Sequence, residues 1–255
     1  MTKFAWNKLG AYLKETQILG SIQNTLYWDQ NTLMPIKGSS WRAEQLTYLA
    51  KILHQRSSSK EFSELIDAAD EELCKTNNNS NDKSDNEAKQ KNLELLKKEL
   101  DRQRKLDPQL VEELARAKSI GYESWHQAKK DSNYEIFLPN FRNIIKLRIE
   151  EAKQLSTEFS PWETLAQPYE PDINKEWLFS ILNPIKDSIP ELISQVNGVK
   201  KEKWDMTPQD QKRLCSNLLN EFGRDENLVA IAESPHPFSI TLGPQDFRIT
   251  TRIVN

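Results

Sequence analysis

The sequence predicts a mainly α-helical fold with a small β-hairpin near the C-terminus. Apolar residues recur at the helical period through most of the 255 residues. Glycine is rare, at seven residues, and alternating β-branched residues are confined to the end of the chain. With 37% apolar and 29% charged residues, the composition favours helices and suits a single domain over residues 1–255.

The first helices are predicted between residue 6 and residue 73. Apolar spacing from Trp6 onward indicates a helix that ends near Met34, because the residue before a proline disfavours helical backbone. A second apolar run covers residues 43–53. Ser58, with a glutamate three residues later, is typical of a capping box and predicts the start of a third helix.

Residues 76–86 contain no apolar side chain, which predicts a mobile polar loop within the domain, and we expect the next helix to begin near Glu87. Later helix boundaries are indicated by capping residues, since their side chains or backbone satisfy the ends of a helix. These are Asp107, Ser160 and Thr207 at helix starts and Gly223 at a helix end. Residues 174–196 indicate a helix broken by Pro184 and Pro190.

Two alternating stretches close the chain. Residues 238–242 and 247–254 are separated by residues 243–246, which predicts a β-hairpin. A hairpin alone is marginally stable, and its free edge invites wrong pairing. We therefore expect the last strand to lead into further structure and the chain to be cut short after it.

Scarce residues exclude several classes of function. No two glycines lie closer than ten residues, so P-loop and dinucleotide-binding fingerprints are absent. The two cysteines are far apart, and no two of the three histidines lie one helical turn apart, so there is no local metal-ligand pair. A formal charge of −3 argues against nucleic-acid binding. No apolar run is long enough to span a membrane, and without a signal-peptide pattern we expect a cytoplasmic location.

Several motifs resemble those of one enzyme family. They are W-D-Q-N-T-L-M-P from Trp28 to Pro35, then Arg42 and Gln45, His236-Pro237-Phe238, and D-x-R-x-T from Asp246 to Thr250. In order and spacing they resemble the Taq-type (thermostable) metallocarboxypeptidases, over nearly the whole chain. The resemblance implies a helical fold whose walls line a groove with a metal at its floor. This chain would supply much of one wall and the first strands of the floor, as an incomplete helical domain.

The same resemblance implies an activity, a cofactor and partners. The family uses zinc or cobalt to remove single residues from the free C-terminus of a peptide, and it forms homodimers. Its H-E-x-x-H segment lies downstream of D-x-R-x-T, whereas this chain ends three residues after Arg252. We therefore expect this chain to hold no catalytic or metal-binding residue, to be inactive alone, and to need a complementing C-terminal half.

The two C-terminal motifs supply the candidates for a substrate cleft. On a strand, Asp246, Arg248 and Arg252 share a face with Thr250, and two guanidinium groups can hold a peptide's terminal carboxylate. The alternative is an Asp–Arg ladder that holds the strand register. His236 either lies on the cleft wall, as the resemblance implies, or anchors a strand by one hydrogen bond. The candidates are His236, Pro237, Phe238, Asp246, Arg248, Thr250 and Arg252.

Trp28, Asp29 and Arg42 are predicted to be structural. We expect Asp29 and Arg42 to form an ion pair beneath the aromatic ring, the alternative being a cleft wall or a mobile cover.

Two functions of different class remain open for the chain. One is the N-terminal portion of a truncated or split carboxypeptidase, and the other is a non-catalytic helical module that binds a peptide or a partner protein.

Overall fold

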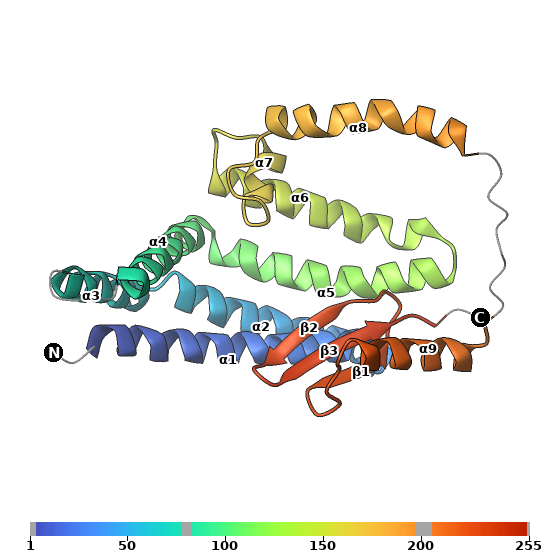
Figure 1. The fold of residues 1–255 in the computed structure, drawn as a ribbon, viewed down its shortest axis with the longest axis horizontal. Coiled ribbons are helices and arrows are strands. Elements are labelled where there is room, and N and C mark those ends of the chain that lie inside the picture. Colours follow the sequence, from blue (N-terminus) through green and yellow to red (C-terminus); the bar gives the residue numbers. More distant parts are fainter. Residues whose placement is uncertain (1–3, 78–82, 197–205, 254–255) are drawn as a thin grey trace.

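The computed structural model describes residues 4–77, 83–196 and 206–253, and it confirms a mainly helical fold with a small sheet (Figure 1). The helices are α1 (Phe4–Thr32), α2 (Ser39–Ser57), α3 (Lys60–Asn77), α4 (Lys83–Lys105), α5 (Pro108–Lys130), α6 (Leu138–Leu155), α7 (Pro161–Ala166), α8 (Lys175–Gln195) and α9 (Pro208–Glu221). Short 3-10 helices cover Ile36–Gly38 and Tyr134–Ile136, and the strands are β1 (Val229–Glu233), β2 (Ser239–Gly243) and β3 (Asp246–Thr251).

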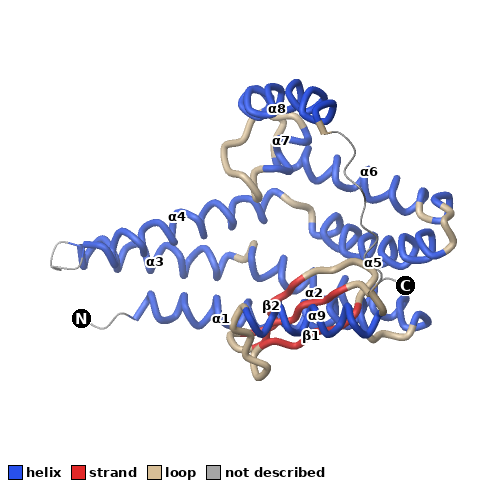
Figure 2. The backbone as a smooth tube through the Cα atoms, turned by 45° about the vertical axis from the view of Figure 1, so that its right-hand side comes forward, coloured by secondary structure: helices blue, strands red, loops and turns tan. Residues whose placement is uncertain are grey.

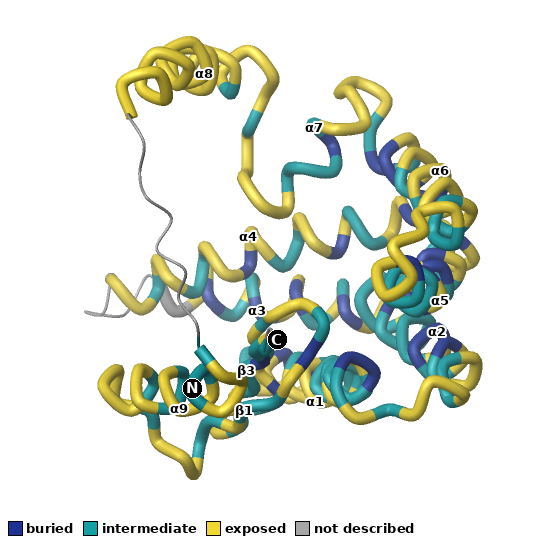
Figure 3. The backbone as a smooth tube through the Cα atoms, turned by 90° about the vertical axis from the view of Figure 1, so that its right-hand side faces the viewer, coloured by how far each residue is buried: buried dark blue, intermediate teal, exposed yellow. Residues whose placement is uncertain are grey.

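The elements follow an open curve. β2 lies against α1, α1 against α2, α2 against α5, α5 against α6, and α6 against α7. Seen from the end away from α3 and α4, this curve runs from the sheet at one end to α8 at the other (Figure 3). α3 and α4 run side by side and project beyond the sheet (Figure 2). Within the described ranges, no helix is both long and apolar enough to cross a membrane.

Most of the predicted caps begin or end helices where expected. Asp107, Ser160 and Thr207 each accept a hydrogen bond from a backbone amide of the first turn, and Ser160 forms a complete capping box. After α9, Gly223 has a positive φ of 77°, and the amide that follows it donates to the Leu219 carbonyl. This is a Schellman motif, which glycine favours because it has no Cβ.

The start of α3 differs from the prediction by one residue. Ser59, not Ser58, is the cap, because its Oγ accepts the Phe62 amide at 3.0 Å. Ser58 instead follows the last residue of α2. The capping-box pattern indicated Ser58, because Glu61 lies three residues after it, whereas Phe62 lies three residues after Ser59. In the structure Ser58 caps the end of α2, so the next serine caps α3.

Two helices are longer than predicted. α3 extends to Asn77 and α4 begins at Lys83 rather than near Glu87, so only residues 78–82 of the predicted loop remain, and these lie outside the described residues. Extending an existing helix costs little compared with nucleating one, so polar residues at its end can remain helical. Likewise, Pro184 and Pro190 lie inside α8 without ending it.

The predicted hairpin is present, but its second strand is not a free edge. β2 and β3 pair antiparallel, and β1 pairs with β3 in parallel, so β3 is the central strand. β1 was not predicted from the sequence. Parallel strands are not joined by a tight turn, so the pairing of β1 with β3 leaves no turn motif in the sequence. β3 ends at Thr251 rather than at residue 254, which lies outside the described part.

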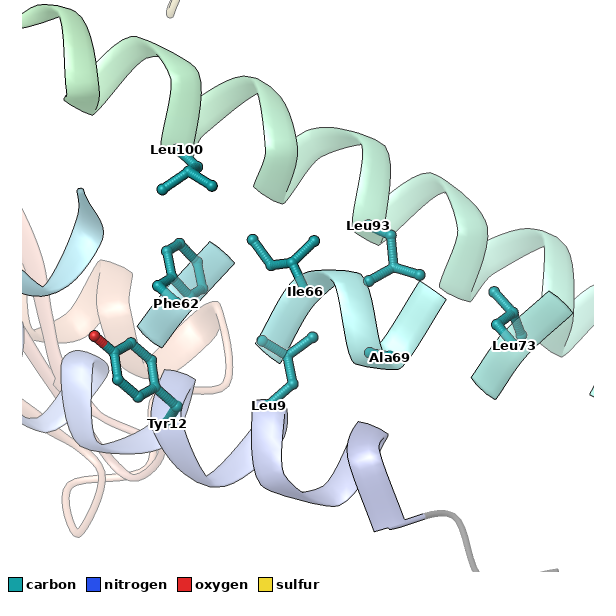
Figure 4. Close-up of a cluster of buried hydrophobic side chains, with 8 residues drawn as sticks. All are labelled: Leu9, Tyr12, Phe62, Ile66, Ala69, Leu73, Leu93 and Leu100. Carbon is teal, nitrogen blue, oxygen red and sulfur yellow. The ribbon is translucent and has the colours of Figure 1, made fainter. Parts of the chain in front are cut away.

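The main apolar core lies between α1, α3 and α4 (Figure 4). Leu9, Ile66 and Leu93 are fully buried there, and Tyr12 stacks on Phe62 with ring centroids 5.4 Å apart. The Tyr12 hydroxyl donates to a carbonyl near the end of α2 at 3.0 Å, so its burial leaves no polar group unpaired. This core holds the first half of α1 in place.

Leu93→Ala is expected to lower the free energy of unfolding by about 2–5 kcal/mol, because it opens a cavity among three helices. Leu95→Ala on the same helix is the matched control, since Leu95 is 52% exposed and Leu93 is 0% exposed. The control should lose less than about 1 kcal/mol. Urea unfolding followed by circular dichroism measures both, and equal losses would contradict this placement of the core.

Candidate functional site

Thr250 joins the two C-terminal motifs by hydrogen bonds. Its side chain is buried, and its Oγ1 accepts the Phe238 amide at 2.8 Å. The same atom lies 2.7 Å from the Ser234 hydroxyl, which donates to the His236 carbonyl at 2.8 Å. The Thr250 amide donates to the Phe238 carbonyl as well. The loop of residues 234–238 and strand β3 therefore form one unit, which we call the Thr250 unit.

Asp246 and Arg248 form a bidentate ion pair on β3. The Arg248 Nη2 lies 2.9 Å from one Asp246 carboxylate oxygen, and its Nε contacts the other. These hydrogen bonds hold the pKa of Asp246 below its ordinary value and raise the pKa of Arg248. The guanidinium carbon also lies 5.2 Å from the ring centroid of Trp28 on α1. Arg248 is thus engaged by groups of this chain, through a pair that lies within one strand.

Trp28, Asp29 and Gln30 hold the end of α1 against three different elements. Successive residues of a helix point about 100° apart, so each of the three faces another neighbour. Trp28 meets β3 through the guanidinium contact just described. Asp29 accepts a hydrogen bond from Arg42 of α2 at 2.7 Å, and Gln30 donates to the Ser119 carbonyl of α5 at 3.2 Å.

Arg42 links the end of α1 to α2 by more than one bond. Besides its ion pair with Asp29, it donates to the Leu26 carbonyl at 2.5 Å and to Gln45 Oε1 at 3.0 Å. The ion pair expected from the sequence is therefore present. The aromatic ring of Trp28 lies against the Arg248 guanidinium, and its buried Nε1 has no hydrogen-bond partner in the described part of the chain.

The remaining predicted residues lie at the surface of the Thr250 unit. His236 and Pro237 are exposed, and His236 anchors the loop through its carbonyl rather than its ring. Phe238 is half-buried and packs edge-on against Tyr27, with centroids 5.8 Å apart. Arg252 is exposed and follows the end of β3, so the strand face predicted for four residues ends at Thr250.

A cavity of about 400 Å³ lies beside Tyr27 and is lined by side chains of α1, α2 and α5, among others. Gln30, Ser119 and Tyr122 contribute polar groups to it. Burial raises the pKa of Tyr122 to about 12, so this phenol stays neutral. These residues were not predicted as a site. Gln30 could have been, since it belongs to the W-D-Q segment, whereas only packing brings the others together.

The described residues do not fit a metal site. In residues 4–77, 83–196 and 206–253, no group of three or more His, Cys, Asp or Glu side chains is placed to hold a metal ion. His54 is buried and hydrogen-bonded to Gln103, and His126 stacks near Tyr122.

Thr250→Val is expected to lower the free energy of unfolding by about 1–3 kcal/mol, because the Phe238 amide and the Ser234 hydroxyl lose a buried partner. Thr241→Val on β2 is the control, since Thr241 is exposed, and it should change stability by less than about 0.5 kcal/mol. Chemical unfolding measures both changes. Amide exchange of Ser234, His236 and Phe238 should quicken only in Thr250→Val, and equal exchange in both variants would refute the Thr250 unit.

Asp246→Asn should weaken the acid dependence of stability. Because Arg248 lowers the folded-state pKa of Asp246, the carboxylate adds stability above its unfolded-state pKa of about 3.9, and this is lost as pH falls through the folded-state pKa. Both side chains are partly exposed, which limits the effect to less than about 1 kcal/mol. Urea unfolding at about pH 7 and about pH 3 measures it. The wild type should lose more stability than the variant, and equal losses would count against the pair.

The chain is similar to known carboxypeptidases over nearly its whole length. It is 27% identical over 263 residues to Thermostable carboxypeptidase 1 of Thermus thermophilus, covering 97% of this chain and 50% of that protein. It is 28% identical over 233 residues to Carboxypeptidase 1 of Bacillus subtilis, covering 89% of this chain and 45% of that protein. The chain therefore spans about half the length of these relatives.

Solved structures and the sequence model of a family also match this chain. The BsuCP crystal structure matches with a TM-score of 0.87 at 26% identity, covering 97% of this chain and 49% of that chain. The M32 carboxypeptidase of Deinococcus radiodurans shares the fold, with a TM-score of 0.77 at 21% identity over 98% of this chain and 49% of its own. The sequence model of Carboxypeptidase Taq (M32) metallopeptidase matches residues 8–255. The chain belongs to the Carboxypeptidase Taq (M32) metallopeptidase family.

Proposed function

We propose that this chain is the N-terminal portion of a metal-dependent carboxypeptidase that removes single residues from the C-terminus of peptides. The family match over residues 8–255 and the half-length coverage of the relatives support this proposal. The main structural support for the proposed site is the Thr250 unit. It joins the H-P-F and D-x-R-x-T motifs, which resemble those of the family. Through Phe238 and Tyr27, this unit lies next to the cavity between the helices.

In this proposal Arg252 binds the terminal carboxylate of the peptide, and Arg248 positions the strand. Arg248 is already engaged by Asp246 and lies over Trp28. Arg252 is exposed beyond the end of β3, where the Ser234 amide donates to the carbonyl of the preceding residue. A guanidinium can hold a carboxylate by two parallel hydrogen bonds. His236, Pro237 and Phe238 then form the adjacent wall of the cleft.

The proposed cofactor is zinc or cobalt, held by a C-terminal half equivalent to the part of the relatives that this chain does not match. Such a metal activates water and polarises the peptide carbonyl. The residues of this chain bind and orient the peptide. Homodimer formation and a cytoplasmic location, both expected from the sequence, stay predictions.

The C-terminal half for the test comes from the gene itself. Reading the DNA beyond the codon for Asn255 in every frame shows whether an H-E-x-x-H segment is encoded there. Where it is not, the unmatched C-terminal half of the Bacillus subtilis relative takes its place. In the experiments below, "the C-terminal half" means the polypeptide chosen in this way.

Co-expression of the chain with the C-terminal half, supplied with zinc or cobalt, is expected to release C-terminal residues from a peptide. Arg252→Gln should lower kcat/KM by about tenfold or more, mainly through KM, because a charge-assisted hydrogen bond to the substrate is lost. Arg213→Gln on α9 is the matched control and should leave kcat/KM unchanged, since Arg213 is exposed and pairs with Asp210 of the same helix. A complex that holds metal but releases no residue would contradict the proposed function.

A further inference from the structure

Helix α8 carries an apolar stripe that is not buried by the described part of the chain. Every residue of α8 except Leu178 is exposed. Large apolar side chains recur along it at intervals of three and four residues, which places them on one face. We call this face the α8 stripe. It consists of Leu178, Ile181, Leu182, Ile185, Ile189, Leu192 and Ile193.

The opposite face of α8 is polar, with Ser180, Asn183, Asp187 and Glu191 along it. A helix divided in this way draws most of its stability from burial of its apolar face, because helix propensity contributes less than tertiary packing. The two internal prolines weaken it further, since each lacks the amide of a helical hydrogen bond. The α8 stripe therefore needs a partner surface.

The position of α8 is consistent with a partner outside this half. In both views α8 stands apart from α5, with α6 and α7 connecting it to the rest (Figures 1 and 3). The match to the BsuCP structure covers 97% of this chain, too much to leave α8 out, yet only 49% of that chain. The matched fold thus occurs in a polypeptide that has a further half beside it.

We propose that the α8 stripe is the docking surface for the C-terminal half of an M32 carboxypeptidase. This inference rests on the proposed function and names the surface through which the two halves assemble. The sheet and α8 lie at the two ends of the curve, so a half that contacts both would span its open side (Figure 3). A membrane surface fits less well, because α8 has two lysines against three acidic residues, whereas membrane-surface helices are rich in Lys and Arg.

Single charges placed on either face of α8 test the docking surface. Ile185→Asp and Ile189→Asp each put a carboxylate on the α8 stripe, and Asn183→Asp adds the same charge to the polar face as the matched control. Binding of the purified chain to the C-terminal half is measured by titration calorimetry. The first two variants should raise Kd by about tenfold or more, and the control should leave it unchanged. Ile185→Ala should weaken binding in the same direction by a smaller factor, and circular dichroism checks that every variant is folded.

The outcomes separate this inference from the proposed function. An unchanged Kd in both stripe variants would overturn the docking surface even where the wild-type halves assemble into an active enzyme. Absence of binding between the wild-type halves would overturn it too. Assembly that the stripe variants weaken, without any peptide cleavage, would uphold the docking surface and contradict the proposed function. Self-association of the chain alone, abolished by Ile185→Asp, would assign the α8 stripe to a second copy instead.

Discussion

The structure depends on a junction at the end of α1, where three consecutive residues hold three different elements. Trp28 lies beneath the guanidinium of β3, Asp29 pairs with Arg42 of α2, and Gln30 bonds to the Ser119 carbonyl of α5. Because a helix turns about 100° per residue, a run of three side chains is enough to reach three neighbours. The junction therefore fixes the end of α1 to the sheet and to both helices beside the cavity, in addition to the hydrogen bonds that earlier turns of α1 make to β2.

The two ends of α1 are held by different forces. Its first half is buried by apolar contacts with α3 and α4, in which Leu9 and Tyr12 take part. Its second half is held by ion pairs and hydrogen bonds, which are directional and so place side chains in defined orientations. This polar half is the one next to the Thr250 unit and the cavity. The apolar end therefore supplies stability, while the polar end positions the candidate cleft.

The molecule has a packed part and an open part. The layer from α1 to α6 buries two apolar clusters between its own helices. By contrast, α8 exposes its apolar face, and the exposed ring of His236 and guanidinium of Arg252 lie beyond the end of the sheet. In the proposed function these exposed groups bind the peptide, and the metal belongs to the other half.

The sequence by itself determined whatever depends on a few neighbouring residues. Helical period, the caps at Asp107, Ser160 and Thr207 and the left-handed Gly223 all follow from contacts within one turn. Motif resemblance added the family and the Asp29–Arg42 pair. Only the tertiary structure decided the parallel pairing of β1 with β3 and the contact of Gln30 with Ser119, which lie 89 residues apart. Such contacts depend on how whole elements pack, and no local pattern encodes that packing.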